Sequence, residues 1–392
     1  MSVDLGERIR EVRKRRGLTQ RQLAELSGVS LSLVRKLEQG ERSDTRLETA
    51  RALAHTLKVP TTHLLAEHGE EAASDATMES WAPVHAALAA SPELDGLGDP
   101  PTFNGVREAL EAAVPLFSGD RFAELGTALP PLLRDTEVLT EMDPRGRPLR
   151  ARLLELTGWL MTQTRQFDAA DMALERALDD ATDRVQSAAT ISVRCWLLLR
   201  RGKLAEAREL ASEWADEVEP RMSRATPAEL SAWGWLLLRL SAAAIRDNRP
   251  GEAEDALRLA NSAAVALGRE CTPEDDFLRT FGPVTVHLKR TENAMVSGRP
   301  DKVLDLAAKI PEGALKPTSN NRNRHLLDVA SAHTQLRQYA EAVDTFQKIR
   351  AGSPQWLPNQ RYARDILGRI VSKRRTLTPE MRELADLVKV PV

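Results

Sequence analysis

Four side chains share the outer face of a short amphipathic segment, residues 31–38: Leu31, Ser32, Arg35 and Lys36. Val34 and Leu37 occupy the opposite, apolar face, as the period of 3.6 residues in an α-helix requires. Arginine or lysine in such a position can donate hydrogen bonds to O6 and N7 of guanine, and leucine can contact the methyl group of thymine. The pattern indicates a helix that contacts the edges of base pairs, and the alternative is a solvated helix face.

The preceding residues predict the elements that hold this helix in place. Thr19 and Gln22 have the spacing of a capping box, which starts a helix directly after Thr19. Gly28 supplies the left-handed turn residue at its end, and Ser30 caps the next helix. These residues predict two short helices joined by a tight turn, which is the pattern of a helix-turn-helix.

Three further helices are expected around that pair, in a domain that we place at residues 1–66. One should run over about residues 5–16, a second capping box of Thr45 and Glu48 should open another, and a short one should begin at Pro60. The apolar residues of the segment after Thr19 are expected to face the core of this five-helix domain: Leu23, Ala24 and Leu26.

Three stretches of this domain resemble the Cro/C1-type (XRE) family of helix-turn-helix proteins: LTQRQLAELSGVS from residue 18, VRKLEQGER from residue 34 and LETARALAHTLKVPTTHLL from residue 47. The resemblance implies that the second helix of the motif lies in the major groove of double-stranded DNA. It also implies that Arg13 and Glu38 join the first helix to the third. The residues implied to bind DNA are Gln20, Ser30, Leu31, Ser32, Arg35, Lys36, Arg42 and Arg46. The loop at residues 41–44 departs from the family because it lacks the usual proline.

Charge is distributed unevenly along the 392 residues. Residues 1–60 hold 13 Lys and Arg residues against 8 Asp and Glu, whereas residues 61–106 hold 8 acidic residues and no Lys or Arg. A basic N-terminal domain is where a polyanion would bind. The acidic segment predicts a linker over residues 67–102 with a short helix near residues 81–88, whose neighbouring acids are solvated or repel phosphate.

The remainder of the chain, residues 103–392, repeats a helix-hairpin pattern. The second helices of the predicted hairpins centre on six positions: Leu125, Ala170, Ala207, Ala253, Val303 and Ala342. The pattern resembles the tetratricopeptide repeat, although its spacings of 45, 37, 46, 50 and 39 residues exceed the usual period of about 34. The predicted fold class is therefore all-α: an N-terminal five-helix Cro/C1-type domain followed by a tetratricopeptide-like α-solenoid.

The first helix of each hairpin should line the concave surface of such a solenoid. The candidate ligand-binding residues on these helices are Arg152, Trp159, Trp196, Arg200, Trp235, Arg246, Asn321 and Arg324. Arginine and tryptophan side chains in one groove could hold an extended peptide, or an apolar ligand with an acidic group. The alternatives are tryptophans that fill gaps between long helices, and a polar loop and helix cap at residues 319–324.

The combination of the two regions resembles the RRNPP-type regulators, bacterial proteins whose repeats bind a short signalling peptide. The resemblance implies a transcription regulator that binds a DNA operator and responds to a peptide or small-molecule signal. One such domain contacts too few base pairs to find a site in a genome, so a homodimer is expected. The alternative is a scaffold whose repeats recruit a protein partner to DNA without a small ligand.

Other classes of function have little support in the sequence. No run of apolar residues reaches 18, so we expect a cytoplasmic protein without membrane association. The two cysteines fit no metal spacing and are expected to be buried, reduced thiols. Because there is no Gly-rich phosphate loop and no nucleophile motif, we expect no enzyme activity, catalytic residue, cofactor or metal site.

Overall fold

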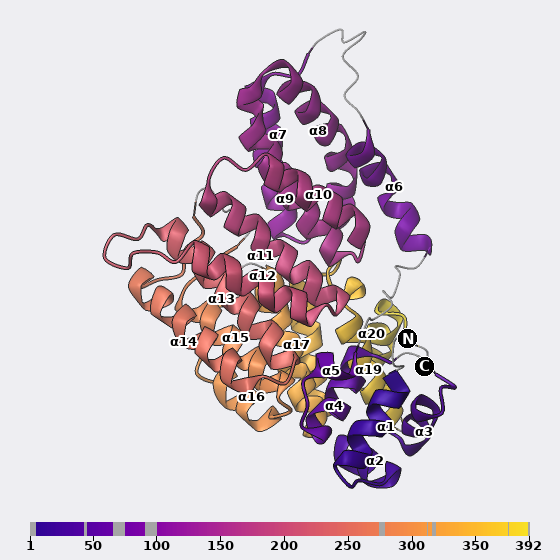
Figure 1. Cartoon of the computed structure of the whole chain (residues 1–392). Helices are drawn as coiled ribbons and strands as arrows, with labels where there is room; N and C mark the ends of the chain where they lie inside the picture. Colours follow the sequence, from indigo (N-terminus) through magenta and orange to yellow (C-terminus); the bar gives the residue numbers. More distant parts are fainter. Residues whose placement is uncertain are drawn as a thin grey trace.

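The computed structural model of the chain describes residues 5–42, 45–65, 75–90, 100–273, 279–311, 313–315, 319–374 and 376–390. Helices dominate these residues, and a single isolated bridge between Cys271 and Phe281 is the one pairing of extended segments among them. The predicted all-α class is confirmed. Five short helices near the N-terminus lie against a curved stack of longer ones (Figure 1). None of the described helices is long and apolar enough to cross a membrane.

The N-terminal domain contains α1 (Leu5–Arg15), α2 (Gln20–Ser27), α3 (Leu31–Glu38), α4 (Leu47–Leu57) and α5 (Thr61–Leu64). The predicted capping box is present, because Thr19 Oγ1 accepts from Gln22 N at 3.1 Å and Gln22 Oε1 accepts from Thr19 N at 2.9 Å. Gly28 has φ +69°, a conformation that costs glycine little. Ser30 Oγ then caps α3 by accepting from Leu33 N at 3.3 Å. The predicted helix, turn and helix are confirmed.

Two local expectations for this domain are wrong. Leu26 is 67% exposed, because Leu23 and Ala24 already fill the side of α2 that faces the core. The second capping box is not formed: Arg46 rather than Thr45 occupies the cap position of α4, and no side chain caps that helix. Thr45 is buried one residue earlier in the chain, so its hydroxyl does not reach the helix start.

Six helical hairpins follow within the described residues. They are α7 (Phe103–Ser118) with α8 (Phe122–Met142), α9 (Arg147–Gln163) with α10 (Phe167–Asp179), α11 (Arg184–Arg201) with α12 (Leu204–Glu217), α13 (Pro227–Arg246) with α14 (Pro250–Leu267), α15 (Pro283–Val296) with α16 (Pro300–Ala307), and α17 (Ser319–Gln335) with α18 (Tyr339–Gly352). All six predicted centres lie on the second helices and are buried. At one crossing, a Cβ on Gly158 would lie 2.6 Å from the Leu174 side chain, so only glycine fits there without a shift.

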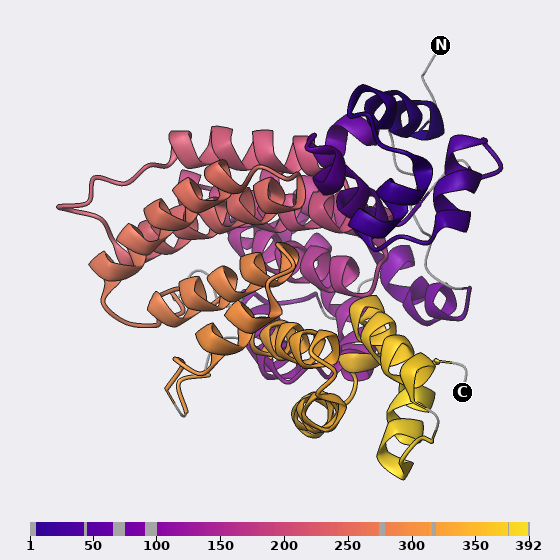
Figure 2. The same ribbon diagram turned by 90° about the horizontal axis from the view of Figure 1, so that it is seen from below.

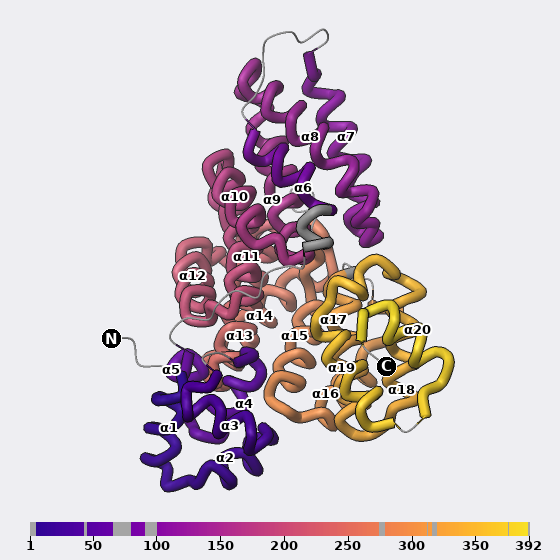
Figure 3. Tube along the Cα trace, turned by 90° about the vertical axis from the view of Figure 1, so that its right-hand side faces the viewer, coloured from indigo at the N-terminus to yellow at the C-terminus, as the bar shows by residue number. Residues whose placement is uncertain are grey.

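The stack curves until its last helices return to its first hairpin (Figures 1 and 3). The short helix η2 (Leu357–Asn359) leads into α19 (Arg361–Lys373) and α20 (Pro379–Leu387). Gln355 Oε1 accepts from Ala123 N at 2.9 Å, and Asn323 Nδ2 donates to Asp120 Oδ2 at 3.4 Å. Residues of α7–α10 and α17–α20 share one hydrophobic core. The two ends of the stack are thereby joined.

The short helix predicted near residues 81–88 of the acidic segment is part of α6 (Asp75–Ala89), which packs on the stack. Trp81, Val84 and Leu88 are buried in the same core as α7–α10. The predicted linker residues at 67–74 and 91–99 lie outside the described residues. The helix within the acidic segment therefore belongs to the core of the repeat region.

Candidate DNA-binding face and inner chamber

The outer face of α3 is open to solvent. Ser32, Arg35 and Lys36 are exposed on it, whereas Val34 and Leu37 are fully buried beneath. Leu31 is half-buried and packs against the core of the domain, so it offers part of its side chain to the surface. Because Ser30 is also exposed at the start of the helix, the predicted base-contacting residues form one continuous face.

Gln20 lies at the first position of α2, where its side chain bonds to protein. Its Nε2 donates to Glu38 Oε2 at 2.9 Å. The buried Glu38 carboxylate also accepts from Arg13 Nε at 2.6 Å and Nη2 at 2.7 Å, so the predicted Arg13–Glu38 pair joins α1 to α3. A phosphate contact by the Gln20 amide would require exchange of its bond to Glu38. The first backbone N–H groups of α2 lack acceptors within the helix and are the more direct donors.

The two arginines predicted to contact phosphate have different surroundings. Arg42 is exposed beyond the end of α3. Arg46 Nη1 donates to Asp365 Oδ1 of α19 at 2.8 Å, and its side chain remains 57% exposed. Two residues later, Glu48 Oε1 accepts from Arg369 Nη2 of α19 at 2.7 Å. The start of α4 is therefore held to the end of the repeat region by two exposed ion pairs.

A second set of contacts joins α5 to the turn between α13 and α14. Thr61 Oγ1 donates to Arg246 O at 2.8 Å, and Thr62 N donates to Asp247 Oδ1 at 2.8 Å. Asn248 Nδ2 donates to Val59 O at 3.2 Å, and Asp247 itself is fully buried. The N-terminal domain thus rests on one edge of the stack and contacts it through both α4 and α5 (Figure 2).

The stack encloses an inner chamber of about 170 Å³. The first helices of five successive hairpins line it, namely α9, α11, α13, α15 and α17, together with residues beside η2. Five of the predicted ligand-binding residues line this chamber: Trp196, Arg200, Arg246, Asn321 and Arg324. The structure therefore brings together side chains that are more than one hundred positions apart in the chain, such as Trp196 and Arg324.

Three of the predicted ligand-binding residues do not line the chamber: Arg152, Trp159 and Trp235. The buried Trp159 ring lies between those of Phe117 and Trp196, with centroid distances of 4.4 and 5.5 Å. The buried Trp235 ring packs below Arg239, whose guanidinium carbon lies 4.9 Å from the ring centroid. Both tryptophans fill gaps between helices, which is the alternative to ligand binding that the sequence left open.

Three charged residues of the chamber were not predicted from the sequence: Arg239, Lys289 and Glu292. Arg239 follows Trp235 by four positions and precedes Arg246 by seven, a spacing that places these residues on one face of α13. Glu292 Oε1 accepts from Arg246 Nη2 at 2.5 Å, and its Oε2 accepts from Lys289 Nζ at 3.0 Å. A cation on the same helix face as a predicted groove residue was the signal available in the sequence.

Burial sets the pKa values of two cations in the chamber. It lowers the pKa of Arg200 to about 9, with a further contribution from Arg165 and Arg324. It also lowers the pKa of Arg239 to about 9, with a contribution from Arg279. Among the described residues, Nε and Nη2 of Arg200 are buried without a hydrogen-bond partner. Among the described residues that line the chamber, cationic side chains outnumber carboxylates.

A second hollow, of about 210 Å³, lies between α4 and the repeat region. Arg51 of α4 lines it, and burial together with the charge of Arg246 lowers the pKa of Arg51. Arg246 and Arg324 line both this interdomain hollow and the inner chamber. Asp328 faces the hollow as well, and burial raises the pKa of its carboxyl group to about 6. The interdomain hollow is therefore separated from the chamber by two shared arginines.

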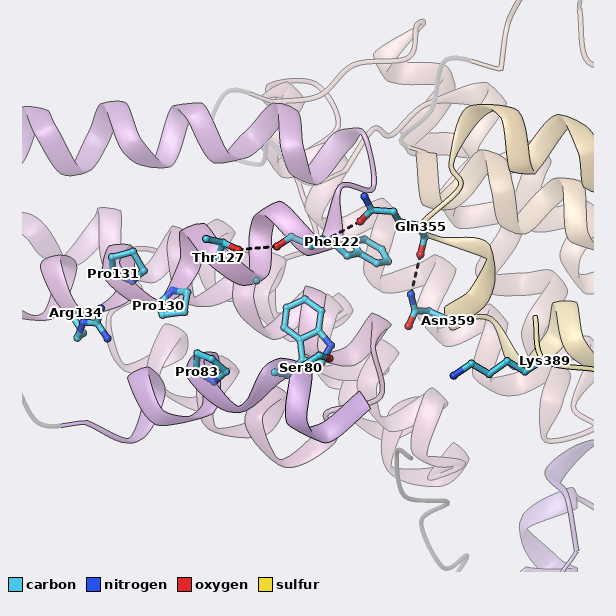
Figure 4. A pocket seen from close by; sticks show the side chains of 13 residues that line it. Ser80, Pro83, Phe122, Thr127, Pro130, Pro131, Arg134, Gln355, Asn359 and Lys389 are labelled. Atoms are coloured by element: carbon cyan, nitrogen blue, oxygen red, sulfur yellow. Dashed lines mark hydrogen bonds between the residues drawn. The ribbon is translucent and has the colours of Figure 1, made fainter. Parts of the chain in front are cut away.

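A larger crevice, of about 850 Å³, lies on the outside of the stack between α6, α8 and the segment around η2 (Figure 4). Apolar side chains such as Phe122 and Pro130 line it. Two of its polar residues bond to the main chain: Thr127 Oγ1 donates to Ala123 O at 3.2 Å, and Asn359 Nδ2 donates to Gln355 O at 2.9 Å. It shares no lining residue with the inner chamber and contains none of the predicted site residues.

Comparison with known proteins identifies the N-terminal domain. A family described as helix-turn-helix matches residues 9–64. Two proteins of Bacillus subtilis (strain 168) are similar over 64 residues: the uncharacterized HTH-type transcriptional regulator RghRB at 42% identity and the HTH-type transcriptional repressor RghR at 39%. The alignments cover 16% of this chain and 46% and 47% of the two relatives, so the chain spans about half the length of the curated relatives it matches. Residues 9–64 thus form a helix-turn-helix domain similar to those of Bacillus transcriptional regulators.

Proposed function

We propose that this protein is a sequence-specific DNA-binding transcription regulator. The observation that carries the proposal is the exposed face of α3 within a helix-turn-helix domain, where Arg35 and Lys36 can donate to base edges. Ser30, Leu31 and Ser32 complete that face. Arg42, Arg46 and the start of α2 at Gln20 are the phosphate contacts that fix its position on the duplex.

The repeat region supplies the regulation in this proposal. Its inner chamber receives a peptide or small-molecule signal at residues that include Trp196, Arg200 and Asn321. Arg246 lines the chamber with its side chain and holds Thr61 of the DNA-binding domain through its backbone oxygen. A ligand that displaces α13 can therefore change how the domain is held. Two copies acting on a two-fold operator require a homodimer, in which this change alters the spacing of the two α3 helices.

The test is genome-wide mapping of the DNA bound by the wild-type protein, followed by binding measurements on the operator it identifies. We expect a site with two-fold symmetry. The double variant Arg35→Ala and Lys36→Ala should lose about tenfold to a hundredfold in operator affinity for each base contact removed, with the helical content of the repeats unchanged. Unchanged operator affinity in that variant would refute the assignment of α3.

The scaffold alternative makes a different prediction for the repeat region. If it holds, a protein partner co-purifies with the full chain, while peptides and metabolites leave the unfolding temperature unchanged. If the sensor proposal holds, at least one peptide or metabolite raises the unfolding temperature by mass action, because a ligand that binds only the folded state stabilises it.

A further inference from the structure

The inner chamber carries an excess of buried positive charge. The carboxylate of Glu292 is the one acidic group among the described residues that line it. Five cationic side chains line it as well: Arg200, Arg239, Arg246, Lys289 and Arg324. Glu292 already bonds to both Arg246 and Lys289. Arg324 has a carboxylate partner that does not line the chamber, because its Nε lies 3.8 Å from Asp328 Oδ1. Arg200 and Arg239 therefore have no carboxylate of their own among the described residues that line the chamber.

The nearest partners of these two arginines are neutral. Arg239 Nε donates to the backbone oxygen of Ser192 at 3.0 Å, and its guanidinium carbon lies 4.9 Å from the centroid of the Trp235 ring. Arg200 lies over Trp196, at 5.8 Å from the ring centroid. Aromatic faces stabilise a cation by about 0.5–2 kcal/mol, which is much less than the several kcal/mol that desolvation of an ion costs.

Other polar atoms of the chamber are also without partners among the described residues. Nε and Nη2 of Arg200 are buried and unbonded, and so are both amide atoms of Gln163, which is 1% exposed and lines the same chamber. Buried polar groups are hydrogen-bonded in the great majority of cases, so several unbonded polar atoms in one chamber need an explanation. The low pKa of Arg200, about 9, expresses the same deficit, because it measures how strongly the surroundings disfavour the charged form.

We propose that the inner chamber is a binding site for a small anionic ligand whose carboxylate or phosphate group bonds to Arg200 and Gln163. This inference rests on the proposed function, since it names the class of ligand to which the repeat region responds. A guanidinium group presents two parallel N–H donors that match either oxyanion. The half-buried Trp196 ring supplies an apolar wall for the rest of the molecule.

The volume limits the ligand further. A chamber of about 170 Å³ lined by five helices and by residues beside η2 suits a compact molecule with one acidic group and a small apolar body. The suitable probes are therefore inorganic phosphate, phenyl phosphate and benzoate. Benzamide has the shape of benzoate without its charge, and benzylamine has the opposite charge, so both serve as negative probes.

The test uses the full chain at constant ionic strength, with chloride as the reference anion. We expect phenyl phosphate or benzoate to raise the unfolding temperature along a saturable curve, and benzamide and benzylamine to leave it unchanged. A stronger response to phenyl phosphate and inorganic phosphate identifies a phosphate ligand, and a stronger response to benzoate identifies a carboxylate ligand. The change Arg200→Gln should weaken binding by at least about tenfold. Arg258→Gln on α14, where the Arg258 side chain is 68% exposed, is the matched control and should bind as the wild type does.

The ligand-free proteins give a second readout. If Arg200 is a binding residue without a structural partner, Arg200→Gln removes an uncompensated buried charge, and its unfolding temperature should equal or exceed that of the wild type. A structural role for Arg200 would lower that temperature instead. Arg200→Lys keeps the charge without the planar fork and should bind anions with intermediate affinity, which keeps the test valid even if Arg200→Gln folds poorly.

Two outcomes overturn the anion site: no saturable response to any of the three anions, or equal binding by the wild type and Arg200→Gln. Operator binding, measured separately, distinguishes this failure from failure of the proposed function. Loss of the anion site with intact operator recognition by the wild type would leave the DNA-binding proposal standing. Absence of a specific operator would refute the regulator proposal, even if anions bind in the chamber.

Discussion

His325 is a buried base held neutral in the middle of α17. Its side chain is 4% exposed, and its Nδ1 has no hydrogen-bond partner among the described residues. Burial, assisted by the charge of His287, lowers the pKa of His325 from 6.5 to about 4. In the unfolded chain the same imidazole takes up a proton near its ordinary pKa. The unfolded state therefore binds more protons than the folded state between about pH 6.5 and pH 4, and acid favours unfolding through this residue.

The variant His325→Gln should remove that contribution. The free energy of unfolding of the wild type, relative to the variant, should fall by up to about 3 kcal/mol as the pH is lowered from 7 to 4, at 1.36 kcal/mol per pKa unit. Chemical denaturation of both proteins at a series of pH values measures this difference. His55→Gln, on the exposed side of α4, controls for the loss of a histidine in general. Parallel pH profiles for the wild type and His325→Gln would contradict the prediction.

At the scale of elements, Gly234 lets α13 pack closely against the ring of Phe281. A Cβ on that residue would lie 2.0 Å from Cζ of the fully buried Phe281 ring, so the two atoms would overlap. Alanine favours a helix over glycine by about 1 kcal/mol. Overpacking of a rigid ring costs about 1–3 kcal/mol or more, so the steric effect should outweigh the gain in helix propensity.

We therefore expect Gly234→Ala to lower the unfolding temperature of the repeat region. Gly368→Ala is the matched control, because Gly368 lies within α19 and a Cβ there would meet no atom within 4 Å. That control should be neutral or stabilised by up to about 1 kcal/mol. Thermal unfolding followed by circular dichroism compares the two variants. A stabilised Gly234→Ala protein would show that Phe281 does not occupy this position in solution.

The same elements show which features the sequence can predict. Each hairpin brings Ala170, Ala207 or a similar residue against a partner helix only a few positions away, so a local pattern was enough to locate all six second helices. The inner chamber depends on how five hairpins are stacked, and no local pattern specifies that. Arg239 was missed for this reason, although its spacing from Trp235 and Arg246 was visible. Thr45 shows the converse, because a correct capping pattern did not form once tertiary packing buried that residue.

At the scale of the whole molecule, the DNA-binding domain is held by two unequal sets of contacts. The bonds from Thr61 and Thr62 end on backbone oxygen and on the fully buried Asp247 carboxylate. The pairs of Arg46 with Asp365 and of Glu48 with Arg369 involve side chains that are 57% exposed on the DNA-binding domain. Exposed ion pairs contribute about 0–1 kcal/mol each. The side of the domain at α4 should therefore separate from α19 more easily than α5 separates from the α13–α14 turn.

That asymmetry leads to a prediction about DNA affinity. Arg46 cannot bond fully to a phosphate group while Asp365 accepts from it at 2.8 Å, so the ion pair and DNA compete for the same guanidinium group. The variant Asp365→Asn removes the competing charge and should increase operator affinity by up to about fivefold, the equivalent of about 1 kcal/mol.

Fluorescence anisotropy at several salt concentrations measures both the affinity and its salt dependence. One additional phosphate contact should steepen the slope of log K against log salt by about 1. The same substitution in an Arg46→Gln background is the control for indirect effects, because Asp365→Asn should then change neither affinity nor slope. An equal gain in both backgrounds would show that Asp365 restrains the whole DNA-binding domain, and that competition for Arg46 is not the cause.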